Sequence, residues 1–150
     1  VSHGNARALC DTPRNYADDA LRQLGNCGGV IGITAYGPLC ETQKGVRPTL
    51  EDMIDHISYV ADLIGIDHVG IGSDFFESES PVRFHAFFKV RYPEVFSQYD
   101  LSNVYFDDFK RVEHFPMLTE ALHRRGFSDE DIGKVLGGNF LRVFDRVWKS

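Results

Sequence analysis

The sequence predicts an α/β fold built around a parallel sheet, and three observations indicate it. Apolar segments of strand length alternate with segments of helical periodicity along most of the chain. The strand-length segments are apolar almost throughout, as expected of parallel strands covered on both faces. Side chains able to do chemistry follow two of these segments, at the strand end where barrel enzymes place their active sites. Such alternation indicates right-handed βαβ units.

The chain opens on the end of a strand. Val1-Ser2-His3 has no turn or helix cap before it, and Gly4-Asn5-Ala6 is typical of the loop that leaves a strand. Because a domain seldom begins inside a strand, we expect an N-terminal portion to be missing from this chain. A helix follows over residues 16–24, with apolar side chains at helical spacing. The apolar run at 29–34 is the next strand.

The clearest helix is expected over residues 50–64. Thr49 and Asp52 form a capping-box pattern, and apolar side chains follow at helical spacing up to Gly65. The apolar segment 68–73 is then the third strand. Its glycines allow another backbone to approach closely.

Beyond the third strand the alternation stops. Residues 75–112 are dense in Phe and Tyr, and we expect an aromatic-rich insert at about 78–112 that forms a packed subdomain, a lid or a subunit contact. Helical patterning resumes over 115–125, after the cap at 128–131, and over 139–148. We see no internal repeats and no linker, so residues 1–150 are part of one domain.

Composition excludes several classes of protein. The 150 residues are 43% hydrophobic and carry a net charge of -6, with 16 basic against 22 acidic residues. That balance is typical of a globular domain and disfavours a nucleic-acid partner, which needs a basic face. No apolar run approaches the roughly 20 residues of a transmembrane segment. A soluble, cytoplasmic protein is favoured, although the compartment is not fixed.

The three cysteines, Cys10, Cys27 and Cys40, show neither metal-binding spacing nor the number that a disulfide scaffold needs. Free thiols are therefore favoured. Because Cys10 and Cys40 each follow a predicted strand by a few residues, a single bridge between neighbouring loops stays open.

Three side chains are candidates for the chemistry. His3 stands where a barrel strand ends and could ligate a metal, although a lone histidine is more often structural. Arg14 could clamp a carboxylate with its two-pronged guanidinium, although an exposed loop arginine is the commoner case. Asp74 ends an apolar strand where no turn requires a carboxylate, and we expect it to be functional.

These segments together resemble the C-terminal part of the membrane dipeptidase (renal dipeptidase) family of the amidohydrolase superfamily. The resemblance runs through Ser2-His3, Arg14-Asn15-Tyr16-Ala17-Asp18, Gly70-Ile71-Gly72-Ser73-Asp74-Phe75 and Gly138-Asn139-Phe140-Leu141-Arg142-Val143-Phe144. It covers nearly the whole chain apart from the insert.

The resemblance implies a (β/α)8 TIM-type barrel, of which this chain holds the last three strands and their helices. It also implies two zinc ions per complete active site, sharing a carboxylate and a bridging water. His3 falls on a histidine ligand of the more exposed zinc, Arg14 on the arginine that grips the substrate's C-terminal carboxylate, and Asp74 on the acid that shuttles a proton from the water to the leaving amine. The remaining ligands are expected upstream of this chain.

The segment after Asp74 departs from the family pattern, because Asp74-Phe75-Phe76-Glu77 and the insert replace the usual short Asp-Phe-Asp-Gly turn. We therefore expect a zinc-dependent dipeptidase whose substrate preference is open. Its expected partners are a dipeptide or small amide and the missing N-terminal half of the barrel, and a homo-oligomer is left open. There are two alternatives. One is another barrel amidohydrolase that acts on a non-peptide amide or ester, and the other is a non-catalytic α/β binding module.

Overall fold

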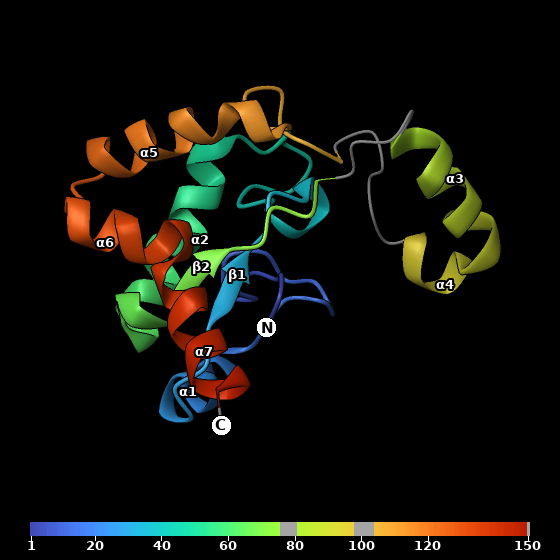
Figure 1. Cartoon of the computed structure of the whole chain (residues 1–150). Helices are drawn as coiled ribbons and strands as arrows, with labels where there is room; N and C mark the ends of the chain where they lie inside the picture. Colours follow the sequence, from blue (N-terminus) through green and yellow to red (C-terminus); the bar gives the residue numbers. More distant parts are fainter. Residues whose placement is uncertain (76–80, 98–103, 150) are drawn as a thin grey trace.

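The structure, a computed structural model, describes residues 1–75, 81–97 and 104–149. A short parallel sheet lies at its centre, with helices around it (Figure 1). The elements in chain order are α1 (Asp18–Asn26), β1 (Ile31–Ile33), α2 (Leu50–Ile64), β2 (Val69–Ile71), α3 (Pro81–Arg91), α4 (Pro93–Phe96), α5 (Phe115–Arg124), α6 (Asp129–Gly133) and α7 (Asn139–Trp148).

The sheet has the predicted parallel arrangement. β1 pairs with β2 in register, with Gly32 opposite Gly70. Both named strands are shorter than the apolar runs that predicted them, but the ladder continues past them, since the Ala35 N–H donates to the Ser73 carbonyl at 3.3 Å. The N-terminal segment lies along the other edge of β1, where Gly4 forms a parallel bridge with Ile33. Three parallel segments therefore lie side by side.

The helices cover the sheet and bury a common core. α2 packs against α1 and α5 and contacts both strands, while α7 packs over β2. The apolar face of α2 is fully buried, as at Met53, Ile54 and Ile57. The predicted capping box is present, with the Thr49 N–H donating to Asp52 at 2.8 Å. No helix of the described segments is long and apolar enough to span a membrane.

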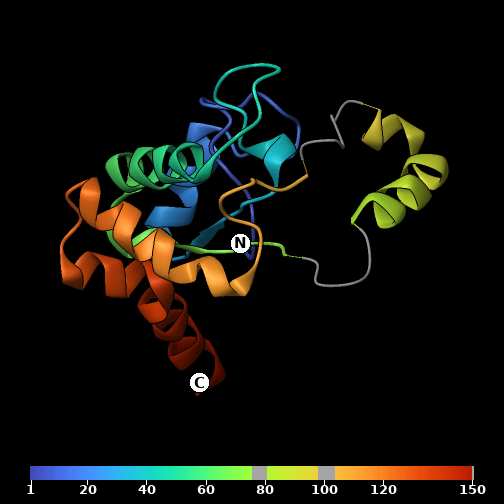
Figure 2. The same cartoon turned by 90° about the horizontal axis from the view of Figure 1, so that it is seen from above.

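The predicted aromatic insert divides into two parts with different fates. α3 and α4 pack on each other and stand clear of the remaining helices in both views (Figures 1 and 2). The part from residue 104 onward instead enters the core, where Phe106 and Phe109 are fully buried. The Asp108 carboxylate accepts the Leu50 N–H at 3.2 Å and so caps α2. Phe106 and Phe109, which the sequence placed in the insert of about 78–112, thus pack in the core, while residues 78–80 and 98–103 of that insert lie outside the described residues.

All three cysteine thiols are free, so the bridge left open by the sequence is not formed. Cys10 and Cys40 are both buried. Burial raises the pKa of Cys10 to about 11. Because the thiolate is the reactive form, such a thiol is expected to be inert at neutral pH.

Candidate active site

The structure brings together the three side chains singled out in the sequence. The Nε2 atom of His3 lies 3.3 Å from Arg14 Nη2 and 3.9 Å from Asp74 Oδ2. The first distance is that of a hydrogen bond, and the second is too long for one. The three residues come from the first segment of the sheet, the loop after it and the end of β2, so they meet at the carboxyl ends of parallel strands.

Two glycines let the His3 segment come this close to the strands. A Cβ atom added at Gly32 would lie 2.3 Å from the Ser2 carbonyl oxygen, and one added at Gly72 would lie 2.1 Å from the same atom. No side chain fits at either place. The predicted close approach of backbones is thus confirmed. Since Gly72 is only two residues before Asp74, this contact also sets the distance between His3 and Asp74.

Asp74 has an unusual backbone conformation. Its φ of 57° is the one positive φ that the structure describes outside glycine. Asp tolerates this left-handed region better than most residues, and such conformations concentrate at functional sites. The Tyr105 hydroxyl donates to the Asp74 carbonyl at 3.0 Å, which fixes the turn from the outside. The carboxylate itself is half-exposed, so it is open to a substrate or solvent.

The loop that carries Arg14 is tied to the end of β1 by buried amides. The Asn15 side chain is 2% exposed and donates to the carbonyls of Cys10 and Leu39, both at 2.9 Å. Asn5, also buried, accepts the Thr34 N–H at 3.0 Å and donates to the Leu39 carbonyl at 3.0 Å. Arg14 is exposed, but the backbone next to it is held firmly.

The partners of His3 assign its tautomer. A guanidinium can only donate hydrogen bonds, so the Nε2 atom beside Arg14 presents its lone pair and the ring proton lies on Nδ1. Nδ1 is 3.0 Å from the Ser2 hydroxyl, which can accept that proton. A neutral imidazole with one nitrogen hydrogen-bonded and the other presenting its lone pair is the form that ligates metals. His3 therefore fits a metal ligand.

These residues do not make a complete metal site among themselves. Residues 1–75, 81–97 and 104–149 contain no group of three or more His, Cys, Asp or Glu side chains placed to hold an ion. A zinc ion normally takes three or four protein ligands, so further ligands would have to come from outside the described residues.

Sequence reasoning missed four residues that shape the site, namely Asn5, Asn15, His56 and Tyr105. His56 was expected to be an ordinary helix residue, but it is fully buried and its Nδ1 accepts the Ala6 N–H at 3.2 Å. Tyr105 was expected in the insert. A weak signal existed for Asn15, which is part of the Arg14 motif, but nothing in the sequence pairs the other three with the site.

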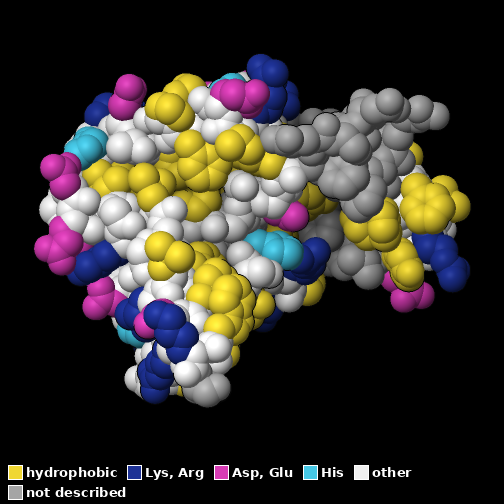
Figure 3. Space-filling view, viewed as in Figure 1, with side chains coloured by type: hydrophobic (Ala, Val, Ile, Leu, Met, Phe, Trp, Pro, Cys, Tyr) yellow, Lys and Arg dark blue, Asp and Glu magenta, His cyan; other side chains and the backbone are white. Residues whose placement is uncertain are grey.

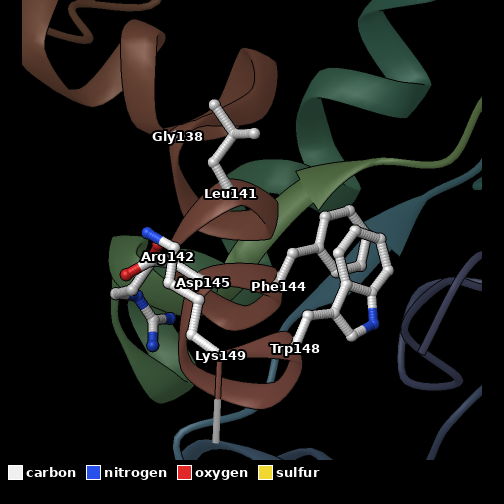
Figure 4. A pocket seen from close by; sticks show the side chains of 7 residues that line it. All are labelled: Gly138, Leu141, Arg142, Phe144, Asp145, Trp148 and Lys149. Carbon is white, nitrogen blue, oxygen red and sulfur yellow. The ribbon is translucent and has the colours of Figure 1, made fainter.

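One pocket of the described residues lies away from the three candidate side chains. A pocket of about 570 Å³ lies on the outer face of α7, lined by Gly138, Leu141, Arg142, Phe144, Asp145, Trp148 and Lys149. The Phe144 and Trp148 rings stack with centroids 4.4 Å apart, and Figure 4 shows the two side chains side by side. Figure 3 shows the hydrophobic side chains gathered over α7. None of the three candidate residues contributes to this pocket.

Comparison with known proteins agrees with this geometry. The model of the membrane dipeptidase family (peptidase family M19) matches residues 1–85 and 95–149. The dipeptidase ataJ of Aspergillus terreus is 36% identical over 147 residues, which are 97% of this chain and 30% of that protein. The chain thus spans about 30% of the length of the first curated relatives that it matches.

Solved structures share the fold. An amidohydrolase from Pseudomonas aeruginosa is 30% identical with a TM-score of 0.83, and the likeness covers 99% of this chain and 45% of that one. A metallo peptidase from Rhodobacter sphaeroides, solved with a phosphinate mimic of the dipeptide L-Ala-D-Ala, is 21% identical with a TM-score of 0.73 over 97% of this chain and 35% of that one. The expected fold class, part of a TIM-type barrel, is confirmed.

The resemblance that the sequence motifs carried is therefore confirmed over both flanks of α3 and α4, while residues 86–94 fall outside the family match. With parallel strands at its centre and His3, Arg14 and Asp74 at their carboxyl ends, the chain belongs to the membrane dipeptidase family, a family of metal-dependent hydrolases.

Proposed function

We propose that the protein to which this chain belongs is a zinc-dependent dipeptidase that hydrolyses dipeptides with a free C-terminal carboxylate. The observation that carries the proposal is the convergence of a metal-type histidine, an arginine and a carboxylate, with Arg14 and Asp74 both within 4 Å of His3 Nε2. Each of the three supplies something that hydrolysis of a dipeptide needs.

His3 would hold one of two zinc ions through Nε2, and the other ligands would come from parts of the protein outside this chain. When bound, zinc supplies Lewis acidity and makes water a usable nucleophile near neutral pH. The Ser2 hydroxyl on Nδ1 keeps the ring in the tautomer and orientation that this ligation requires.

Asp74 is the proton shuttle in this proposal. Its carboxylate would accept the proton of the attacking water and return it to the amine nitrogen as the C–N bond breaks. The φ of 57° and the hydrogen bond from Tyr105 to the main-chain carbonyl hold the Asp74 backbone in place without occupying the carboxylate oxygens. Those oxygens therefore stay available for proton transfer.

Arg14 would bind the substrate's C-terminal carboxylate. A guanidinium offers two parallel N–H donors that match a carboxylate, which gives orientation as well as attraction. In this structure Arg14 Nη2 lies on His3 Nε2, the atom expected to ligate zinc. With the ion bound, the guanidinium would turn from His3 toward the substrate.

The alternative within the same class is an amidohydrolase acting on a non-peptide amide or ester. The likeness to the Pseudomonas aeruginosa amidohydrolase supports keeping it. The two differ in what Arg14 does, because only a dipeptidase needs a clamp for a terminal carboxylate. Membership in a metallopeptidase family disfavours the third hypothesis, a non-catalytic binding module.

The direct test is metal analysis and a dipeptide-hydrolysis assay on the full-length protein, with His3→Ala beside the native enzyme. We expect His3→Ala to lose roughly one equivalent of zinc, because an ion left with two protein ligands is held poorly. His123→Ala is the matched control, since His123 is an exposed histidine that faces Asp129. Full retention of zinc by His3→Ala would refute the ligand assignment.

A further inference from the structure

The loop that carries His3 and Arg14, residues 3–16, is called the site loop. Contacts on two sides hold its backbone at Ala6. Ala6 forms a parallel bridge with Tyr16, in which the Arg7 N–H donates to the Tyr16 carbonyl and the Tyr16 N–H donates to the Asn5 carbonyl, both at 2.9 Å. This pairing leaves the Ala6 N–H pointing away from Tyr16. Its acceptor is Nδ1 of His56, at 3.2 Å.

A histidine is an unfavourable side chain at position 56, because it lies in the apolar core. It is fully buried on the apolar face of α2, one turn from Met53 and Val60. Its Nε2 atom makes no hydrogen bond of normal geometry in the part of the chain that the structure describes, and only a weaker interaction ties the ring to the Cys40 backbone. Because a buried polar atom without a partner is destabilising, an apolar side chain would suit the core better. What an apolar side chain could not provide is the hydrogen-bond acceptor for the Ala6 N–H.

The Ala6–Tyr16 bridge lies between the two loop residues of the site. His3 is three residues before Ala6, and Arg14 is two residues before Tyr16. Any movement of Ala6 is therefore passed to both, and the separation of 3.3 Å between Arg14 Nη2 and His3 Nε2 depends on it. Asp74, on the strand β2 side, is outside this loop.

We propose that His56 is a positioning residue: by accepting the Ala6 N–H it holds the loop that places His3 and Arg14. The proposal rests on the proposed function in both of its readouts, zinc binding and hydrolysis. Asn5 secures the neighbouring residue to Thr34 and Leu39, so His56 supplies the contact that comes from α2.

The test compares His56→Leu with His56→Asn in the full-length protein. Leu fills the space without an acceptor, whereas the Asn Oδ1 can reach the place of Nδ1 and take the Ala6 N–H. We expect His56→Leu to weaken zinc binding and to raise KM, each by roughly 10- to 100-fold, the size typical of lost support for metal ligands. The value of kcat should change less, since Asp74 is not on the loop. His56→Asn should restore both quantities to within a few-fold.

Ile57→Val is the matched control on the same buried face of α2, because it trims the core without touching a hydrogen bond. It should lower stability and leave zinc affinity and KM unchanged. If His56→Leu does not fold, His56→Gln takes its place, since its amide reaches toward Nε2 rather than Nδ1. Equal zinc affinity and KM in all folded variants, or an Asn variant as impaired as the one lacking the acceptor, would overturn the proposal.

Zinc affinity is measured by competition with a chelator and does not depend on the substrate. A native enzyme that binds zinc but cleaves no dipeptide would refute the proposed function alone. In that case the zinc affinities of the Leu and Asn variants would still decide whether His56 positions His3.

Discussion

The site loop, residues 3–16, and the α3–α4 lobe, residues 81–97, are built in opposite ways. The loop is held by buried polar groups, among them Asn5, Asn15 and His56. The lobe packs on itself, through rings such as Phe88 and Tyr92 at 5.9 Å, and leaves Phe87 64% and Val90 85% exposed. The family match includes the loop and omits residues 86–94. The residues proposed for the chemistry thus lie on a loop held by several buried contacts, whereas the segment outside the family match lies in the lobe.

The comparison predicts large functional effects at the site. The largest is expected for Asp74→Asn, which should lower kcat by about 10²-fold or more, the effect of losing a general acid–base. Asn tolerates the left-handed φ of 57° as well as Asp does, so the backbone should not change. Steady-state kinetics and metal content of the full-length variant measure this.

Asp67→Asn is the control for Asp74. Asp67 is an exposed carboxylate near the opposite end of β2, where it pairs with Lys134, and its loss should leave kcat unchanged. Normal turnover in Asp74→Asn, or loss of its zinc, would show that Asp74 is not the proton shuttle.

The next effect is expected for Arg14→Lys, which keeps the charge and loses the two-pronged donor. The value of kcat/KM for dipeptides should fall by about 2 to 4 kcal/mol in transition-state terms. An amidated dipeptide should lose a similar amount with the native enzyme. Arg22→Lys on the exposed face of α1 is a suitable control. Cleavage of the amide as fast as of the acid would favour the alternative amidohydrolase.

The sequence predicted the fold well where local pattern decides it. The capping box at Thr49 and the apolar spacing after it predicted α2 at its observed bounds, and the apolar runs predicted two parallel strands. Pattern says little about contacts between distant residues. A histidine such as His56 has the same period whether it faces solvent or the core, and the Tyr105 bond to the Asp74 backbone spans 31 residues.

The insert is a second case in which the local sequence pattern does not determine the contacts. Aromatic density predicted that residues 78–112 form something compact, but it could not say which rings face the core. Phe109 does, packing against Phe75 and Phe115 at 5.2 and 5.6 Å, whereas Phe87 does not. The three site residues were found through the motifs around them, since each alone is more often structural.

We expect the free energy of unfolding to depend on pH through His56, the buried histidine beneath the site loop. Burial lowers the pKa of His56 from 6.5 to about 4. Between these values the unfolded chain binds a proton that the folded chain does not, so the free energy of unfolding decreases as the pH falls. The effect is small at pH 7, grows as the pH falls through 6.5 and reaches about 3 kcal/mol near pH 4.

Urea unfolding of the metal-free protein between pH 7 and 4.5 measures this dependence. His56→Asn removes the titrating group and should flatten the pH dependence over this range by about 2 to 3 kcal/mol, while other groups contribute equally to both proteins. Parallel curves for the two would mean that His56 is not kept neutral by burial.

The smallest effect on stability is expected for deletion of residues 81–97, joined by a short Gly/Ser linker. None of the side chains that the structure describes in this lobe belongs to the hydrophobic core, so the shortened protein should fold, bind zinc and unfold within a few degrees of the native Tm. Substrate preference or self-association should change instead, because the exposed rings of the lobe are lost.

Deleting 78–112 is the contrasting variant. It also removes Phe106 and Phe109, each worth about 3 to 5 kcal/mol in a core, which together exceed the stability of many domains. Circular dichroism and size-exclusion chromatography of both variants decide the matter. If the shorter deletion unfolds the protein, the lobe is part of the barrel and the contrast with the site loop fails.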